Sequence, residues 1–250
     1  MSFELAVWYE PEPITREHAR SVLQAARHAA SEGDPAPSGE DEGHAERPGG
    51  TGAFEQGSGE RAAEGERTAE GERMAEDEDE VAEPHPGVVA FAERLPGAER
   101  LSPDLILVTL TPQEADEVSA EIFALAAECG LVCYDPQRHL VHNLGPRGVY
   151  PTMEMRTGDG MIVIGPDLRL VSDALTTLSP QNPFMALVVF GEHFVQTSPE
   201  PSGYELEYRD SVRGRMFRTH VTDLSAVQDA FTEYATGVRA FLDRHDWQPV

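Results

Sequence analysis

The start of the chain shows a run of β-forming residues, followed by apolar residues that recur with the period of a helix. The run FELAVWY at 3–9 is rich in β-forming residues and predicts a first strand. The stretch 15–33 then predicts a helix, with Thr15 as N-cap and Gly33 at its end. Its apolar face consists of Ala19, Val22, Leu23 and Ala26.

The most strongly specified pattern lies at 104–130. The continuous apolar run DLILVTL at 104–110 indicates a buried strand. Thr111 follows as an N-cap, and Glu114 completes a capping box. Apolar residues at spacings of three and four predict a helix as far as Gly130, with one stripe facing a sheet. That stripe consists of Ala115, Val118, Ile122, Leu125 and Cys129.

The stretch GLVCYDPQRHLVHN at 130–143 combines cysteine, aspartate and histidine, so it raises the question of a catalytic or metal site. Its pattern favours a hairpin. Asp135 begins a type I turn between two short strands, and Cys133 is typical of a small buried residue. Alternation along the returning strand places His139 and His142 on opposite faces, so we expect no shared metal.

The last hundred residues predict a second unit of hairpins and helices. Strands are expected at 152–157, 161–164, 182–191, 193–198, 204–210 and 215–221. Helices are expected at 165–178 and 222–247, the second broken or kinked near Gly237. Successive hairpins followed by a covering helix imply an antiparallel sheet with helices on one face.

These elements predict an α+β fold of two small domains, each a mainly antiparallel or mixed sheet covered by helices. The first domain comprises 1–33 and 84–148, and the second comprises 149–250. Between the halves of the first, 34–83 shows no hydrophobic period and contains the hexads GERAAE, GERTAE and GERMAE. We predict an acidic, low-complexity, disordered insertion there, with an acidic tail for a basic partner as the alternative.

The formal net charge is −26. Residues 32–83 hold 18 acids and 4 arginines, a net of −14, so the rest of the chain carries −12. An acidic surface repels phosphate backbones and anionic lipids, so we expect neither nucleic acid nor membrane as a partner. The first residues lack a basic segment followed by an apolar one, and the two cysteines suit no disulfide framework. Both observations favour a reduced, cytoplasmic protein.

No phosphate-binding loop, nucleophile elbow or zinc spacing occurs, so we expect no cofactor and no metal. In YELEYR, alternation puts Tyr204, Leu206 and Tyr208 on the core face and directs Glu205 and Glu207 outward. Two carboxylates on one face also occur in glycosidases, but a solvated strand face is the more common reason for such a pair.

Two stretches resemble known groups of proteins. FELAVWYE together with SAEIFALAAECGLVCYDPQ is similar to a family of uncharacterised actinobacterial proteins. The C-terminal stretch, from NPFMALVVFGEHFVQTS to TDLSAVQDAFTEYATG, resembles toxin-associated immunity-type proteins. The second resemblance implies an inhibitor that binds a toxin, and neither resemblance carries a catalytic motif.

We therefore expect a non-catalytic protein-binding module, of the immunity type, whose acidic surface binds a basic partner such as a toxin. Glu205 and Glu207 are the candidate partner contacts. The alternative is a small-molecule-binding protein or a hydrolytic enzyme of unrecognised type.

Overall fold

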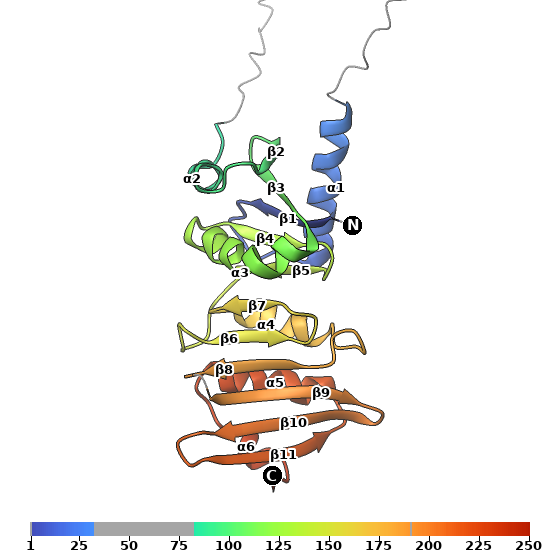
Figure 1. Ribbon diagram of the computed structural model, residues 1–250, viewed down its shortest axis with the longest axis vertical. Helices are drawn as coiled ribbons and strands as arrows, with labels where there is room; N and C mark the ends of the chain where they lie inside the picture. Colours follow the sequence, from blue (N-terminus) through green and yellow to red (C-terminus); the bar gives the residue numbers. More distant parts are fainter. Residues whose placement is uncertain (1, 33–82, 191) are drawn as a thin grey trace, which may run out of the picture. The chain divides into compact units, whose positions relative to one another are not determined.

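The structure, a computed structural model, describes residues 2–32, 83–190 and 192–250. It contains helices and two antiparallel sheets (Figure 1), which confirms the predicted α+β class. Met1–Gly33 and Glu83–Val250 form one compact unit that holds both sheets. The division into two domains stays a prediction, and the predicted acidic insertion, apart from Glu83, lies outside the described residues.

The N-terminal strand is the central strand of a five-stranded sheet of order β2-β3-β1-β4-β5, in which every neighbouring pair is antiparallel. The strands are β1 (Phe3–Trp8), β2 (Glu99–Ser102), β3 (Leu105–Leu110), β4 (Val132–Asp135) and β5 (Leu140–His142). β1 pairs with β3 along its whole length, with Phe3 opposite Leu110. The two strands predicted at 3–9 and 104–110 are confirmed, and they are hydrogen-bonded neighbours.

Both faces of the five-stranded sheet are covered by helices. These helices are α1 (Arg16–Glu32), α2 (Pro86–Arg94) and α3 (Pro112–Glu128). Ala19 and Leu23 of α1 pack in one core cluster with Tyr134. α2 and α3 contribute to the cluster on the other face, which includes Leu131 and Cys133. Successive side chains of β4 enter opposite faces, as the two-residue period of a strand requires.

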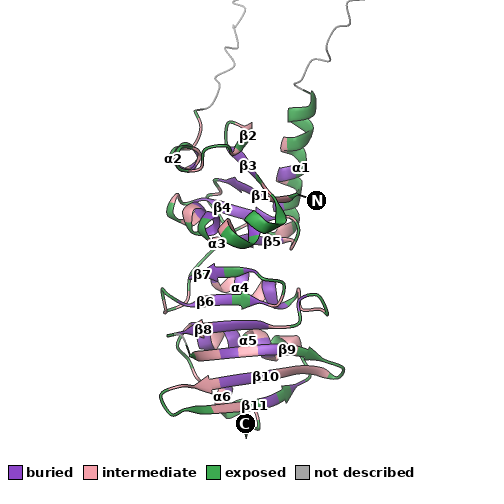
Figure 2. Cartoon of the chain, in the orientation of Figure 1, coloured by how far each residue is buried: buried purple, intermediate pink, exposed green. Residues whose placement is uncertain are grey.

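The C-terminal part forms a seven-stranded antiparallel sheet of order β12-β11-β10-β9-β8-β6-β7. Its strands are β6 (Glu154–Thr157), β7 (Ile162–Ile164), β8 (Met185–Val189), β9 (His193–Glu200), β10 (Gly203–Asp210), β11 (Arg215–Val221) and β12 (Gln248–Pro249). The expected strands are present, and β12 adds a short edge strand that the pattern did not indicate. Figure 2 shows buried positions running along the middle strands.

Three helices lie on one face of this sheet (Figure 1). They are α4 (Leu168–Leu175), α5 (Leu224–Ala235) and α6 (Phe241–Arg244). Phe231 and Tyr234 of α5 are buried in the same cluster as Leu206 and Tyr208 of β10. The predicted final helix is interrupted at Gly237, whose φ of 79° lies in the left-handed region that glycine adopts without steric cost.

α3 begins with the predicted capping box. The Thr111 hydroxyl accepts a hydrogen bond from the Glu114 amide at 3.2 Å, and the Glu114 carboxylate accepts one from the Thr111 amide at 2.8 Å. The predicted stripe is wrong in part, because Phe123 and Ala126 are buried whereas Leu125 is half-buried. The cause is a second contact: α3 also packs against β7, so its buried surface is wider than one sheet face requires.

A buried carboxylate joins the end of β5 to the start of α4. Asp167, the N-cap of α4, accepts hydrogen bonds from the Leu170 amide at 2.8 Å and, through its other oxygen, from the Asn143 amide at 2.9 Å. Only 3% of Asp167 is exposed, and this burial raises the pKa of its carboxyl although amide donors act in the opposite direction. One side chain thus connects the end of a strand of the five-stranded sheet to a helix that lies on the seven-stranded sheet.

Candidate interaction surface on the seven-stranded sheet

One face of the seven-stranded sheet is left open by α4, α5 and α6, which all lie on the opposite face (Figure 1), while α3 packs against the sheet at β7. Residues directly opposite each other in an antiparallel ladder point to the same side. The strand register therefore identifies the side chains of this open face. They include Ile162, Ile164, Val188, Phe194, Gln196, Glu205, Glu207, Arg218 and His220.

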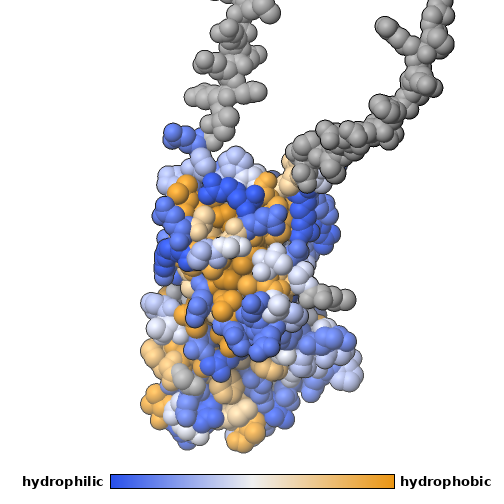
Figure 3. All heavy atoms as spheres, turned by 45° about the horizontal axis from the view of Figure 1, so that its top comes forward, coloured by the Kyte–Doolittle hydropathy of each residue, from blue (hydrophilic) through white to orange (hydrophobic). Residues whose placement is uncertain are grey.

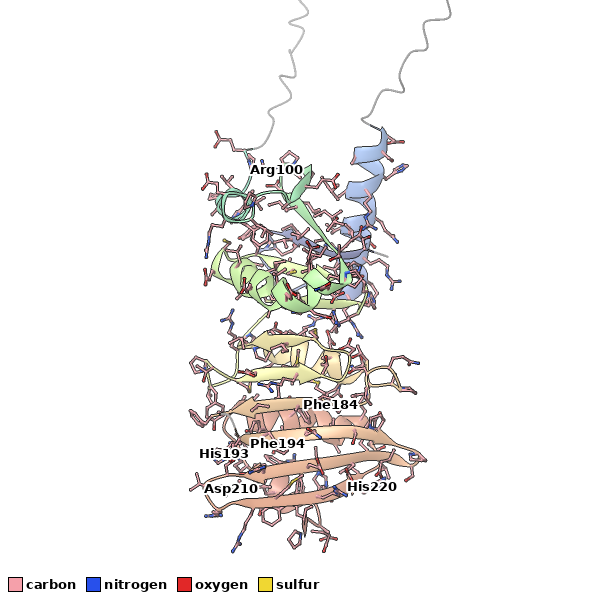
Figure 4. All side chains as sticks on the ribbon, viewed as in Figure 1. Arg100, Phe184, His193, Phe194, Asp210 and His220 are labelled. Atoms are coloured by element: carbon pink, nitrogen blue, oxygen red, sulfur yellow. The ribbon has the colours of Figure 1, made fainter. Side chains whose placement is uncertain are left out.

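The β7 side of the open face carries accessible apolar side chains, which lie beside the ion pair of Glu154 and Arg156 on β6. Ile162 and Ile164 are 42% and 47% exposed, and Val188 and Phe194 are half-buried. Figure 4 labels Phe194 on β9, next to the strands that carry the charged residues. Hydrophobic residues also reach the surface among hydrophilic ones in the space-filling view of the molecule (Figure 3). Apolar side chains left exposed at the edge of a sheet provide area that a partner could bury.

The β11 side of the open face is organised around Arg218. Its Nε lies 3.0 Å from Glu205 Oε2, and its Nη2 donates to Glu207 Oε1 at 2.9 Å. Gln196 on β9 donates to the second oxygen of Glu207 at 3.3 Å. The hydrogen bond that Arg218 donates to Glu207, and then the charge of Glu205, raise the pKa of the Arg218 guanidinium. Two carboxylates thus share one cation and leave one excess negative charge.

The two glutamates predicted as partner contacts lie together, but in different environments. The alternation that separates them from Leu206 is confirmed, since Leu206 is buried in the helix-covered core. The expectation that both are solvated is wrong for Glu207, which is only 7% exposed because Gln196 and Arg218 cover it. Glu205 is half-buried and stays accessible from solvent.

His220 extends the polar side of the open face. Its Nε2 lies 3.7 Å from the Glu200 carboxylate and 3.2 Å from the Ser202 hydroxyl. With Asp246 and Gln248 it lines a shallow hollow of about 210 Å³ that also includes Glu205 and Arg218. His220, labelled in Figure 4, is exposed, and it lines this hollow together with the carboxylates of Glu200, Glu205 and Asp246.

In the hairpin at 130–143, the contacts of the polar side chains stabilise the fold. The Asp135 carboxylate accepts from the amides of Gln137 and Arg138 at 2.9 and 3.0 Å, which closes the predicted turn. Arg138 then joins Asp135 to Asp159 through Nη1 at 2.9 Å and Nε at 2.7 Å. Burial, outweighing these contacts, raises the pKa of Asp135.

The two histidines of the hairpin lie on opposite faces of the sheet, as predicted. His142 stacks on Phe123 of α3, with ring centroids 3.8 Å apart, whereas His139 lies 2.8 Å from the Tyr134 hydroxyl on the α1 side. The returning strand begins at Leu140, one residue later than expected, because His139 has a left-handed φ of 54°.

Burial, followed by the nearby charge of Asp135, raises the pKa of the Cys133 thiol well above its ordinary value.

Within residues 2–32, 83–190 and 192–250, no three His, Cys, Asp or Glu side chains come together as metal ligands would. None of the described helices combines the length and apolar character needed to cross a membrane.

Comparison with protein-family models, curated proteins and solved structures found no match.

The role of Arg218 was missed in the sequence, although a signal for it was present. The loop between YELEYRD and RMFRTHV has four residues, and a symmetric hairpin about it pairs Glu207 with Arg218. Cross-strand pairs of opposite charge on one face are a recurrent unit of sheet stabilisation. The contribution of Gln196 on β9 depends on a second pairing of β10, which becomes evident only in the assembled sheet.

Proposed function

We propose that this chain is a non-catalytic, cytoplasmic protein-binding module of the immunity type, which engages a basic protein partner, such as a toxin, through the open face. The observation that carries this proposal is the combination of accessible apolar residues at β7 with carboxylates held in place by Arg218. The proposal assigns the chain no cofactor, nucleic acid or membrane.

The charge of the chain supports a basic partner. Residues 33–82 account for −12 of the net charge of −26, so the remainder carries −14. A net negative protein attracts a cationic surface over distances comparable with the Debye length, roughly 10 Å at 0.1 M salt. Such steering raises the association rate more than it changes the dissociation rate.

The arrangement of Glu205 also supports this function. Arg218 holds its carboxylate at 3.0 Å, so a partner would lose little side-chain entropy in binding it. The acids outnumber the bases around the adjacent hollow, where Glu200, Glu205 and Asp246 face Arg218. A lysine or arginine of the partner would balance the excess charge, while Ile162 and Ile164 would be covered by apolar contacts.

We expect Glu200→Lys combined with Glu205→Lys to slow association with the partner by at least about tenfold, because the two reversals invert the field at the open face. The measurement is surface-bound kinetics between 0.02 and 0.5 M salt, with the basic protein that co-purifies with the full chain as analyte. Glu207→Gln, which removes the buried charge but keeps the side-chain size, tests the second candidate contact and should weaken binding.

The matched control is Glu117→Lys combined with Glu121→Lys, which changes the net charge equally on the exposed surface of α3. It should slow association by less than about threefold. If the two double variants slowed association equally, only the overall charge of the protein would matter, and the open face would be excluded as the binding site. Binding that is insensitive to salt would exclude the electrostatic mechanism.

A further inference from the structure

A second cavity lies at the opposite side of the β10–β11 hairpin from the open face. It has a volume of about 550 Å³, which is within the usual range for small-ligand sites. One wall is the hairpin end, near Asp210 in Figure 4, and the other comes from Arg239, Leu242 and Trp247. The cavity thus lies on the helix-covered side, beyond the end of α5.

The floor of this cavity is aromatic. Tyr208 and Phe217 face each other across β10 and β11, and both line the cavity together with Trp247. The rings of Tyr208 and Trp247 meet edge to face, with centroids 6.4 Å apart, and Phe241 packs behind both. A flat apolar group placed here would contact ring faces and edges that are fixed by the core.

The rim of the cavity is basic. Arg213, Arg215 and Arg239 line it, and Asp210 is the one carboxylate that the described part of the chain adds to the lining. Asp210 lies 3.7 Å from Arg213, a distance that gives weak pairing at an exposed position. Arg239 is fixed by neutral groups: it donates to the Val238 carbonyl at 2.9 Å, and to the Tyr150 hydroxyl at 3.1 Å.

This excess of positive charge is unusual for the molecule. Ten of the fifteen arginines in the described part of the chain lie within 4.0 Å of a carboxylate oxygen. Arg215 and Arg239 are among the five that have no such partner in that part. The chain has 45 acidic and 19 basic residues, so guanidinium groups without a carboxylate partner are uncommon in it. Because two of them lie at one aromatic cavity, this cavity favours the binding of an anion.

We infer that this cavity binds a small organic anion with a flat apolar body. Its ring system lies against Tyr208, Phe217 and Trp247, and its carboxylate or similar group faces Arg213 and Arg215. An inorganic anion would leave the aromatic floor unused, and a nucleic acid would meet the negative charge of the rest of the chain. The cavity shares no lining residue with the polar hollow of the open face, so this inference is independent of the proposed function.

The test is a titration of the full, ¹⁵N-labelled chain with 2-naphthoate, followed through the indole N–H signals of its two tryptophans. We expect the Trp247 signal to shift in a saturable way, with a Kd on the order of 1 mM or lower for a ligand of this size. Trp8 is buried against α1, and its Nε1 donates to Glu10 at 2.7 Å, so its signal should not move. The neutral analogue 2-naphthalenemethanol should bind at least tenfold more weakly.

Arg213→Gln combined with Arg215→Gln should weaken naphthoate binding at least tenfold, whereas Arg20→Gln combined with Arg100→Gln should change it less than twofold. The control pair alters the net charge equally, at α1 and β2, and like Arg215 it has no carboxylate partner among the described residues. An unchanged Trp8 signal reports that each variant is folded. The inference is overturned by any of three results: no saturable Trp247 shift, equal binding of the neutral analogue, or equal losses in the two double variants.

Discussion

Replacing Asp167 by alanine is expected to lower the free energy of unfolding by roughly 3 kcal/mol. The substitution removes the N-cap of α4 and leaves buried backbone amides without a hydrogen-bond acceptor. The Asp167 carboxylate accepts from the amides of Leu170, Asn143 and Leu144 at 2.8, 2.9 and 3.4 Å. With the side chain only 3% exposed, water cannot replace it without rearrangement of the β5–α4 junction. Urea denaturation at pH 7, analysed by linear extrapolation, gives the difference.

Asp223→Ala is the matched control for this prediction. Asp223 is the N-cap residue of α5 and has extended backbone like Asp167, but its side chain makes no capping hydrogen bond. It is exposed, so its replacement should cost less than about 0.5 kcal/mol. Similar losses for the two variants would show that Asp167 acts only as an ordinary helix-end charge and does not hold the two sheets together.

The stability of the protein is expected to fall as the pH falls from about 6.5 to 4.5, with a contribution of about 2–3 kcal/mol from His142 alone. Burial, with a smaller contribution from the Arg138 charge, lowers the pKa of His142 from 6.5 to about 3. In the unfolded chain the ring takes up a proton near pH 6.5, whereas in the folded protein it stays neutral. Protons therefore favour the unfolded state throughout this window, by about 1.4 kcal/mol per pH unit.

His142→Phe isolates this contribution. Both ring nitrogens of His142 are buried and have no hydrogen-bond partner among the described residues, and the ring stacks on Phe123 at an interplanar angle of 12°. Phenylalanine keeps a flat ring and removes the titrating group. Between pH 7 and 4.5, the free energy of unfolding of the variant should therefore gain about 2–3 kcal/mol relative to that of the natural chain.

His28→Phe, at an exposed position of α1, serves as the control for this pH series. Its stability should follow that of the natural chain within about 0.5 kcal/mol over the same range. Parallel curves for His142→Phe and the natural chain would contradict the assignment, because they would mean that His142 takes up its proton equally in the folded and unfolded states.

Local patterns in the sequence predicted the features that depend on neighbouring residues. The capping box of Thr111 and Glu114 involves residues three positions apart, so its geometry follows from the helix start itself. The opposite faces of Cys133 and Tyr134 follow from the two-residue period of a strand. The break at Gly237 follows from the conformational freedom of glycine.

Contacts between distant segments decided what the sequence could not show. β1 lies between β3 and β4, and such pairing depends on which buried faces fit together rather than on any local period. α3 buries Phe123 against the ring of His142 on β5, and α3 also packs against β7, about forty residues further on. Glu207 is buried because strands on both sides of β10 place Gln196 and Arg218 over it.

The sequence by itself determined the α+β class, most of the strands and helices, the acidic charge of the chain and the structural character of the 130–143 hairpin. Each of these depends on composition or on spacings of two to four residues, which are readable along the chain. The tertiary structure alone decided that Gln196 joins Arg218 in covering Glu207, and that three arginines gather at an aromatic cavity. That cavity combines a hairpin, the loop after α5 and the C-terminal segment, and such a convergence arises only when the segments pack around one core.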